Sequence, residues 1–351
     1  MGGGYDAPCL PPPSGVGRLS LARVRPLRCL VVGQLPAPDV DLIRSLVPEG
    51  RVELVLAESP AVLADLGQFD VIWRLFPGII NGAFQDLFPA ALDSHPEVRW
   101  VHTASAGIDQ LASYFRNRGQ VTLTHSAGVT AIPISEFVVT CLLHHCKRFP
   151  ELAALQSRRQ FEQLSLGELG DLKVVLFGLG AIATEVARRL SPFGCSITGV
   201  RRDSGKAGPP GVSKVFAARD LVRACSAADA LVLVAPLTAQ TAGVVNRTVL
   251  SELADGSVLV NVARGGLIDE ADLIEEMGKG RPEAAYLDAF LEEPLPASSA
   301  LWTTPGVHIS PHLSWSSPHL AHRTSEFFAQ QLCRWLDGEA LANRADPEAG
   351  Y

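Results

Sequence analysis

The chain has 351 residues, of which 47% are hydrophobic and 19% are charged, and its formal net charge is -7. This length exceeds what one hydrophobic core usually serves, so we expect a globular protein of two domains. The negative charge argues against a nucleic-acid or anionic-membrane partner, and the longest apolar runs, such as residues 230–237, are too short to cross a membrane.

The chain opens on a segment that is dense in glycine and proline. Residues 1–26 contain MGGGYDAPCLPPPSGVG and no continuous apolar stretch, so we predict a disordered leader and no secretion signal. Short apolar runs then alternate with helical patterns up to about residue 148, and the strand candidates are RCLVVG, RVELVLA, FDVIWRLF, VRWVHTASAG and VTLTHSAG. This alternation predicts a first parallel α/β layer. The helical pattern ISEFVVTCLLHHCKRF that follows is long enough to lead the chain out of this first domain.

A second alternating run begins at LKVVLFGLG. Its further strand candidates are CSITGVR, ALVLVAPL, SVLVNVA, AAYLDAF and VHISPHL, and six strands in this pattern predict a doubly wound parallel sheet. The amphipathic pattern SSPHLAHRTSEFFAQQLCRWLDG then predicts a helix that returns to the first domain. We therefore expect an α/β fold of two Rossmann-like domains with a cleft between them. The substrate domain would comprise residues 27–148 plus 317–351, and the dinucleotide-binding domain residues 149–316.

The cysteines and histidines indicate the compartment and the metal content. Seven cysteines are widely scattered without a Cys-x-x-Cys pair, which predicts a reducing, cytoplasmic environment and no disulfide framework. His144 and His145 are adjacent on a predicted helix and would point in different directions. We expect no metal site.

The segment VLFGLGAIATEVARRL has the strand, turn and helix of a dinucleotide-binding unit. Gly178, Leu179 and Gly180 form a turn that lets the backbone approach a pyrophosphate at the helix N-terminus. Ala183 stands where a third glycine is usual, and alanine is an accepted substitute because that position mainly serves helix–strand packing. The motif alone is weak, but with both flanking strands in place it predicts a nicotinamide-cofactor site.

The next strand ends in TGVRR, so Arg201 lies at or beside the position of the acidic residue that binds the ribose of NAD. An arginine there can pair with the 2′-phosphate of NADP, and Arg202 adds a second positive charge. The alternative is that both arginines belong to a solvated turn. We predict NADP(H) as the preferred cofactor, with NAD(H) possible.

Three later strands end in chemically active side chains. LVNVARGG contains Arg264, YLDAFLEEPLP contains Asp288 and Glu293, and VHISPHLSW contains His308 and His312. In an open α/β sheet the carboxyl ends of the strands line the ligand crevice. Each residue alone could be structural, for example a satisfied core histidine, so the prediction depends on their occurrence together.

An arginine, a carboxylate and a histidine together suit the reduction of a keto acid. The arginine can bind the substrate carboxylate and polarise the carbonyl, and the histidine can supply the proton that accompanies hydride transfer. A carboxylate beside the histidine stabilises the imidazolium form. The pattern predicts Arg264, Glu293 and His312 as the catalytic set.

Over residues 71–335 the chain resembles the D-isomer-specific 2-hydroxyacid dehydrogenase family, which includes the glyoxylate/hydroxypyruvate reductases. The motifs that carry the resemblance are TASAGID, PISEFV, VVLFGLGAIA, APLTAQTAG, NVARGGLIDE, LDAFLEEPLP and SPHLSW. The resemblance implies that Arg264 binds the substrate and that His312 donates the proton. It also implies that Glu293, and not the neighbouring Glu292, partners the histidine.

The resemblance further implies binding residues, product and assembly. The loop formed by Ser105, Ala106 and Gly107 would hold the substrate carboxylate through its backbone amides, from the other domain. The product would be a D-2-hydroxy acid, and a homodimer is expected. The implied cofactor contacts are Leu179, Gly180, Ala181, Ile182, Ala235, Pro236, Thr241, Val262 and Asp288.

Three other readings stay open. The first is a formate or phosphite dehydrogenase. A formate dehydrogenase would be expected to have a glutamine beside its histidine, where this chain has Glu293. A phosphite dehydrogenase would be expected to have a lysine at the position of Ala106. A nucleotide-sensing, corepressor-like protein of the same fold would bind the cofactor without turnover. The third reading is a reductase for a keto acid larger than glyoxylate, and the candidates for an apolar wall are Phe76, Trp315 and Trp335. Arg74, at a strand end of the first domain, could face the cleft, but we expect a surface role for it.

Overall fold

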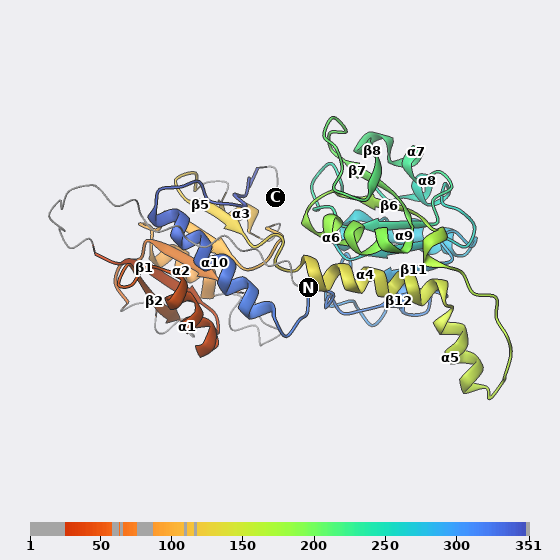
Figure 1. The fold of residues 1–351 in the computed structure, drawn as a ribbon, viewed down its shortest axis with the longest axis horizontal. Coiled ribbons are helices and arrows are strands. Elements are labelled where there is room, and N and C mark those ends of the chain that lie inside the picture. The colour runs from red at the N-terminus through yellow and green to blue at the C-terminus, as the bar shows by residue number, and fades with distance from the viewer. Residues whose placement is uncertain are drawn as a thin grey trace.

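The computed structural model describes residues 25–57, 63, 66–75, 87–108, 111–115 and 118–348. Its strands form two fully parallel sheets, of five and seven strands, and Figure 1 shows each sheet with its helices in a separate lobe. The expected α/β class with two Rossmann-like units is confirmed. Among the described helices, none is long and apolar enough to cross a membrane.

The first sheet has the strand order β2-β1-β3-β4-β5. Its five strands are the five that the apolar runs predict. The helices described in this part lie between β1 and β2, between β3 and β4, and between β4 and β5, as expected for parallel strands that need crossover connections. The elements are β1 Leu27–Val32, α1 Ala37–Leu46, β2 Val52–Ala57, β3 Val71–Arg74, α2 Leu87–Ser94, β4 Trp100–Thr103, α3 Ala112–Phe115 and β5 Thr122–His125.

The second sheet has the order β12-β11-β10-β9-β6-β7-β8. Since β6 lies between β9 and β7, the chain direction across the sheet reverses at β6 and β9, and this switch point is where such sheets bind ligands. The helices and strands from the first sheet onward are α4 Ala131–Cys146, α5 Phe149–Ser157, β6 Lys173–Phe177, α6 Ala181–Leu190, β7 Ser196–Arg201, β8 Val212–Ala217, α7 Leu221–Cys225, β9 Ala230–Leu233, α8 Arg247–Leu250, β10 Val258–Asn261, α9 Glu270–Met277, β11 Ala284–Leu287, β12 Val307–Ile309 and α10 Leu320–Leu336.

The prediction of six strands for this sheet was wrong by one, because β8 was missed. Its residues have the burial pattern intermediate, exposed, exposed, intermediate, intermediate, buried. It is the edge strand beside β7, so one of its sides lacks a neighbouring strand. An edge strand can carry polar residues such as Ser213 and Lys214, which hide the apolar pattern that central strands show.

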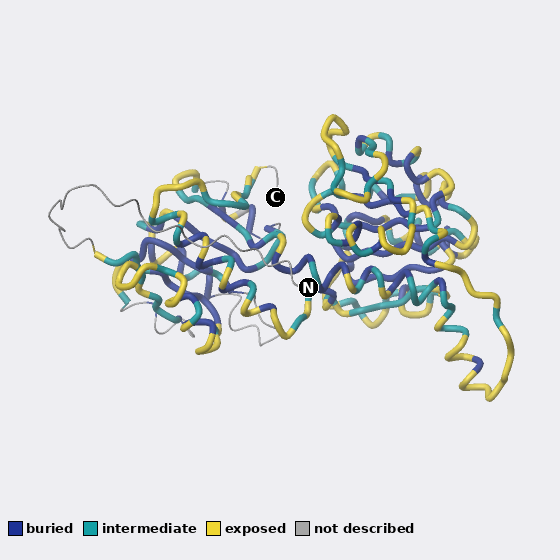
Figure 2. Tube along the Cα trace, viewed as in Figure 1, coloured by how far each residue is buried: buried dark blue, intermediate teal, exposed yellow. Residues whose placement is uncertain are grey.

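The core of the second sheet lies along its central strands. All four residues of each of β9, β10 and β11 are buried, and Figure 2 shows these strands dark within the lobe. Parallel strands covered by helices on both faces are apolar on both faces, which explains their continuous apolar sequences.

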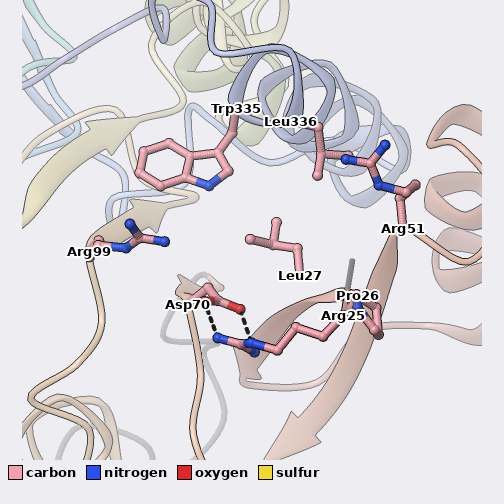
Figure 3. Close-up of a pocket in the computed structure, with 8 residues that line it drawn as sticks. All are labelled: Arg25, Pro26, Leu27, Arg51, Asp70, Arg99, Trp335 and Leu336. Atoms are coloured by element: carbon pink, nitrogen blue, oxygen red, sulfur yellow. Dashed lines mark hydrogen bonds and ion pairs between the residues drawn. The ribbon is translucent and has the colours of Figure 1, made fainter. Parts of the chain in front are cut away.

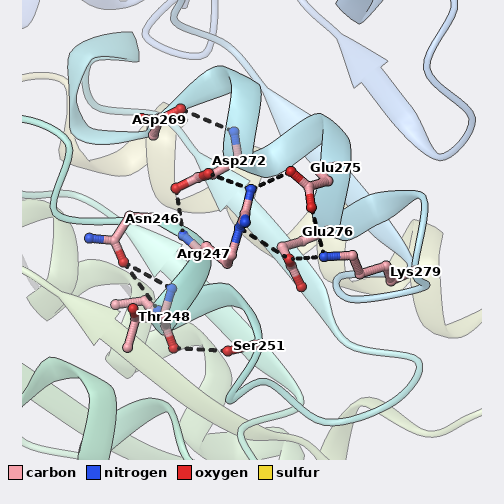
Figure 4. Close-up of polar contacts among 10 residues, drawn as sticks. Asn246, Arg247, Thr248, Ser251, Asp269, Asp272, Glu275, Glu276 and Lys279 are labelled. Atoms are coloured by element: carbon pink, nitrogen blue, oxygen red, sulfur yellow. Dashed lines mark hydrogen bonds and ion pairs between the residues drawn. The ribbon is translucent and has the colours of Figure 1, made fainter.

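A polar network joins α8 to α9 at the periphery of this sheet (Figure 4). Asn246 caps α8 by accepting the amides of Thr248 and Val249, and Asp269 caps α9. Asp272 accepts the amide of Arg247 at 2.9 Å, and the guanidinium of Arg247 also pairs with acidic side chains of α9. Exposed ion pairs contribute at most about 1 kcal/mol each, so the helix caps and the backbone hydrogen bonds are the firmer part of this connection.

The C-terminal helix α10 packs on the first sheet, although it follows the second in sequence. Phe328 stacks on Trp73 at 4.1 Å between ring centroids, and Trp335 stacks on Trp100 at 5.3 Å. Figure 1 shows this helix crossing back to the lobe that contains β1 to β5. The domain boundaries drawn from the sequence stay a prediction.

A small pocket of about 270 Å³ lies at the amino-terminal edge of the first sheet (Figure 3). Leu27, Arg51 and Arg99 line it just before or at the start of their strands, together with Trp335 from α10. Trp335 therefore lies at the edge opposite to the carboxyl ends of the strands. The suggestion that Trp335 could form an apolar wall of the substrate cleft was wrong, because its ring stacks on Trp100 at this amino-terminal edge.

Residues 1–24 of the predicted leader lie outside the described residues, and so does Phe76. Arg25 is described, and its guanidinium makes two hydrogen bonds to Asp70, at 2.8 and 3.1 Å. Asp70 also accepts the backbone N–H of Arg28. The ordered contacts of the first sheet thus extend two residues before β1.

Candidate active site

The turn between β6 and α6 is shaped for close approach of a ligand to backbone. Gly178 has φ of 105°, and a Cβ there would lie 2.7 Å from the backbone N of Ala235, so this position requires glycine. Gly180 is the N-cap of α6, makes no side-chain cap, and has open space around it. The first N–H groups of α6 therefore lack a side-chain cap, and such groups at a helix N-terminus can bind a phosphate.

Side chains of Leu179 and Ala183 pack against the second sheet and its helix, so the main chain of the turn is not covered by them. Ala183, in the first turn of α6, is fully buried between this helix and the sheet, and a larger residue there would push the helix away from the sheet. A Cβ on Gly199 of β7 would lie 2.6 Å from the Leu179 side chain, so Leu179 packs back on β7. Ile182 is half-buried and Ala181 is exposed. A ligand at this turn would meet chiefly main chain.

Arg201 is the last residue of β7 and is half-buried, and Arg202 follows it in an exposed position. They lie at and just beyond the carboxyl end of the strand next to β6, the side on which the Gly178 turn lies. Within the described part of the chain, the guanidinium of Arg201 makes no hydrogen bond or ion pair, while Arg202 interacts with another group. Two guanidinium groups at this point suit an additional phosphate.

The strand ends after β9 and β10 lie beside the turn. Ala235 is buried against Gly178, while Pro236 is exposed. The Thr241 hydroxyl donates to the Pro236 carbonyl at 2.8 Å, so it closes this loop upon itself. Val262, after β10, is 6% exposed. These residues form the floor of the switch point, and direct cofactor contact by each of them stays a prediction.

Arg264 is held by a backbone arrangement after β10. Fully buried Asn261 accepts the amide of Ala263 at 3.1 Å and donates from its side chain to the Arg264 carbonyl at 3.0 Å. A Cβ on Gly265 would overlap the backbone of Phe290, so the chain after Arg264 passes directly against the segment after β11. The sequence reasoning missed Asn261, whose signal was a polar residue that ends an otherwise apolar strand.

Glu293 and His312 lie side by side after β11 and β12. The Nδ1 atom of His312 is 2.8 Å from Oε2 of Glu293, and Oε1 of Glu293 accepts the backbone N–H of Phe290 at 2.9 Å. Because a carboxylate only accepts hydrogen bonds, Nδ1 carries the proton and Nε2 is left to face a ligand.

The ionisation of Glu293 follows from its surroundings. Partial burial alone would raise the pKa of its carboxyl group, but the hydrogen bonds from His312 and Phe290 oppose this. With the further effect of the charges of His312 and Arg264, the pKa of Glu293 is held below its usual value. Arg264 therefore lies within electrostatic range of the pair, and Glu293 stays ionised near neutral pH.

The carboxylate of Asp288, after β11, is engaged by the loop that follows β12. Asp288 is 0% exposed, and its carboxylate accepts the Ser310 hydroxyl at 2.6 Å and the amides of Leu313 and Ser314 at 2.9 Å each. These donors belong to the loop that carries His312, whose φ of 50° is unusual for a residue other than glycine. In this structure Asp288 fastens the His312 loop, and its direct contact with a cofactor stays a prediction.

The loop proposed to hold the substrate carboxylate follows β4. The Ser105 hydroxyl donates to the Gly107 carbonyl at 3.0 Å, which curls the loop so that its amides, including that of Ala106, can converge. After the next strand, a Cβ on Gly128 would lie 3.8 Å from Cβ of Ala181 in α6. The carboxyl edge of the first sheet therefore abuts the helix N-terminus of the second.

Other candidate residues lie elsewhere or have other partners. His308 stacks on Tyr286 at 4.4 Å, apart from the Glu293 pair. Trp315 donates its indole N–H to the His312 carbonyl at 2.7 Å, so it supports the same loop, and its part in an apolar wall stays a prediction. His144 contacts the Tyr286 hydroxyl, whereas His145 contacts the Gly256 carbonyl.

Residues 139–314, about half of the chain, match a family model described as D-isomer specific 2-hydroxyacid dehydrogenase, NAD binding domain. Among curated proteins, the chain is similar to glyoxylate/hydroxypyruvate reductase A of Enterobacter sp. (strain 638). The two are 28% identical over 265 residues, which are 73% of this chain and 82% of that protein. The protein of the same name from Klebsiella pneumoniae subsp. pneumoniae is 31% identical over 218 residues, or 62% of this chain and 69% of that protein.

Solved structures show the same similarity. An NADPH-dependent glyoxylate/hydroxypyruvate reductase from Sinorhizobium meliloti, in complex with NADP and sulfate, matches with a TM-score of 0.77 and 26% identity, covering 93% of this chain and 100% of that chain. A D-isomer specific 2-hydroxyacid dehydrogenase family protein from Aeromonas salmonicida subsp. salmonicida matches with a TM-score of 0.78 and 25% identity, covering 92% and 99%.

Proposed function

On the premise that the chain belongs to the D-isomer specific 2-hydroxyacid dehydrogenase family, we propose that it is an NADP(H)-dependent reductase of 2-keto acids. The product would be the D-2-hydroxy acid, and the substrates would be of the glyoxylate/hydroxypyruvate type or larger. The observation that carries the proposal is the 2.8 Å contact between His312 and Glu293, at the same edge of the sheet as the open glycine turn after β6. The names of the relatives favour this reductase over a cofactor sensor or a formate or phosphite dehydrogenase.

The residues after β6 fit a dinucleotide. The backbone of Gly178 runs close to that of Ala235, and there is open space at Gly180. A pyrophosphate at a helix N-terminus requires both features. Arg201 and Arg202 would bind the 2′-phosphate of NADP. When bound, the nicotinamide would supply the hydride.

The substrate would be held from both lobes. The amides of the loop Ser105 to Gly107 would bind its carboxylate, and the Arg264 guanidinium would bind the carboxylate and the carbonyl oxygen. A planar guanidinium can make two parallel hydrogen bonds, which fixes the orientation of the carbonyl group. Orienting the carbonyl in this way lowers the entropy cost of reaching the reactive geometry.

His312 would act as the general acid. Its Nδ1–H donates to Glu293, so a second proton on Nε2 can pass to the carbonyl oxygen as the alkoxide develops. The ionised carboxylate of Glu293 balances the imidazolium charge before that transfer. In the oxidative direction the neutral Nε2 would accept the same proton.

We also propose a homodimer in which α5 and the segment after it take part. Four large apolar residues of this region, Phe149, Leu152, Phe161 and Leu166, are exposed. Figure 1 shows α5 projecting away from the lobe of the second sheet. Several exposed apolar side chains on a projecting arm suit a surface that a partner would cover. Light scattering on the purified protein, with Phe161→Ser as the variant, tests this proposal.

We infer the cytoplasm as the compartment. The six cysteines in the described part of the chain are free thiols, four of them buried, which suits a reducing environment. Fractionation of the producing cell is the direct measurement.

The test of the proposed function is steady-state oxidation of NADPH and NADH with a panel of 2-keto acids. The panel includes glyoxylate, hydroxypyruvate, pyruvate, phenylpyruvate and branched-chain acids. We expect turnover of roughly 1–1,000 per second with the best acid, and a higher kcat/KM with NADPH than with NADH. Tight binding of NADPH without turnover on any acid would contradict the reductase.

A further inference from the structure

Arg74 occupies the carboxyl end of β3 and is not the surface residue that the sequence suggested. Its register partner in the neighbouring strand β4 is Thr103, and the substrate loop begins two residues after Thr103. Its side chain is only partly exposed. The guanidinium group thus lies at the same sheet edge as the loop of Ser105 to Gly107.

The guanidinium of Arg74 has few partners for its charge. Its Nη1 donates to the Thr103 hydroxyl at 3.3 Å, and its central carbon lies 5.6 Å from the ring centroid of Phe88. Within the described residues, no carboxylate forms an ion pair with it. Burial lowers the pKa of Arg74, which reflects the loss of water around the charge. A desolvated cation without a counter-charge is unfavourable unless a ligand supplies one.

A chain of hydrogen bonds connects this cation to the substrate loop. The Thr103 hydroxyl lies 2.9 Å from the Ser105 hydroxyl, which in turn donates to the Gly107 carbonyl. Neighbouring strands are about 4.8 Å apart, so a group bound by Arg74 would be about one strand spacing from a group held by the loop. Two carboxylates joined by a two- or three-carbon linker span about that distance.

Resting on the proposed function, we propose that Arg74 binds a second carboxylate at the far end of the substrate, so the favoured substrates are 2-keto diacids of four or five carbons. The first carboxylate would lie at the loop and Arg264, as for any 2-keto acid. One hydrogen bond to Thr103 leaves several guanidinium N–H groups for two parallel bonds to the distal carboxylate. Phe88 would support the guanidinium from its other side through a cation–π contact.

The experiment compares matched pairs of substrates. Oxaloacetate is paired with 2-ketobutyrate, and 2-ketoglutarate with 2-ketovalerate, with NADPH as cofactor. The wild-type protein should have the higher kcat/KM for the diacid of each pair. In Arg74→Met the ratio of diacid to monoacid kcat/KM should fall about 10- to 100-fold, the range expected on loss of a charge-assisted hydrogen bond.

Two further variants make the result specific to this position. Arg99→Met removes an exposed arginine next to β4 at the opposite edge of the same sheet, and it should keep the wild-type ratio. Arg74→Lys keeps a charge but loses the two-pronged geometry, so its ratio should lie between those of wild type and Arg74→Met. A wild-type preference for monoacids, or an equal fall for both members of a pair in Arg74→Met, would overturn the proposal.

A binding measurement separates this proposal from the proposed function. Calorimetry of the NADP⁺-loaded protein with succinate and with butyrate needs no turnover. We expect tighter binding of succinate, and loss of that difference in Arg74→Met. Equal binding of the two by wild type would refute the second carboxylate site. Absence of turnover on the whole keto-acid panel and on oxaloacetate and 2-ketoglutarate would refute the reductase and leave this comparison valid.

Discussion

The buried carboxylate of Asp288 accepts the backbone N–H of Leu313 at 2.9 Å, and so the strand end of β11 fixes the residue that follows His312. The same carboxylate accepts the Ser314 amide and the Ser310 hydroxyl. His312 has a left-handed backbone conformation, which costs about 1–3 kcal/mol and persists only where the surroundings impose it. The hydrogen bonds to Asp288, together with the one from Trp315 to the His312 carbonyl, hold the loop in this conformation.

Asp288→Asn should therefore lower kcat by at least about tenfold. The amide keeps one acceptor oxygen but turns an NH₂ group towards one of the backbone amides, so the loop loses a hydrogen bond and gains a repulsion. If Asp288 acts through the loop, the dissociation constant of NADPH should change little, while a cofactor contact would weaken it in parallel with kcat. Asp255→Asn, at an exposed carboxylate, is the matched control.

His312→Gln should lower kcat for reduction about 100- to 10,000-fold, the usual contribution of a general acid. Glutamine keeps a polar side chain of similar length but cannot donate a proton to the developing alkoxide. NADPH affinity should be retained. His322→Gln, on the exposed face of α10, serves as the control, and a near-normal kcat in His312→Gln would exclude the assigned role.

The pH dependence should report the Glu293–His312 pair. The pKa of Glu293 is below its ordinary value in the folded protein, so the stabilising contribution of its ionised form is present above the unfolded-state pKa. That contribution is lost as the pH falls through the lowered folded-state value. Reduction needs the imidazolium form, so kcat/KM should fall on the alkaline side.

In Glu293→Gln the kcat for reduction should fall, because no carboxylate then accepts the Nδ1–H of His312 and holds its ring in place. The acid-side loss of stability that Glu293 contributes should also disappear. Glu292→Gln, at the adjacent exposed residue, should leave the profile as in wild type. Coincident profiles of stability against pH for wild type and Glu293→Gln would contradict the lowered pKa of Glu293.

Arg201→Asp should reverse or strongly reduce the preference for NADPH. The aspartate repels a 2′-phosphate and can accept hydrogen bonds from ribose hydroxyls, so the ratio of kcat/KM for NADPH over NADH should fall at least about tenfold. Arg219→Asp, exposed after β8, is the control for a general change in surface charge. An unchanged ratio in Arg201→Asp would remove Arg201 from the phosphate site.

Gly178→Ala should impair both folding stability and cofactor binding. Its Cβ would meet backbone atoms of Ala235 at 2.7 Å, and the residue also has positive φ. Gly280 has positive φ as well but open space around it, so Gly280→Ala measures the backbone strain alone. We expect Gly178→Ala to lose about 1–3 kcal/mol more than Gly280→Ala in thermal or denaturant unfolding, the usual penalty of overpacking.

Much of the cofactor unit could be predicted because its signals are local. The apolar strand β6, the two glycines and the amphipathic helix α6 are contiguous, and their backbone requirements can be read from residue type alone. The strand-end positions of Arg264, Glu293 and His312 were accessible for the same reason, since parallel strands bring their carboxyl ends to one edge. Polar strand β8 lacked such a local signal and was missed.

By itself, the sequence determined the alternation of strands and helices, the glycine turn after β6, and which strand ends carry chemically active side chains. These features depend on backbone preferences and on apolar periodicity within short segments. Only the tertiary structure decided that Asp288 holds the His312 loop, that Trp335 packs on Trp100 at the far edge, and that Arg74 faces Thr103. Those relationships join residues from different elements, and they are set by strand register and packing, which no short segment contains.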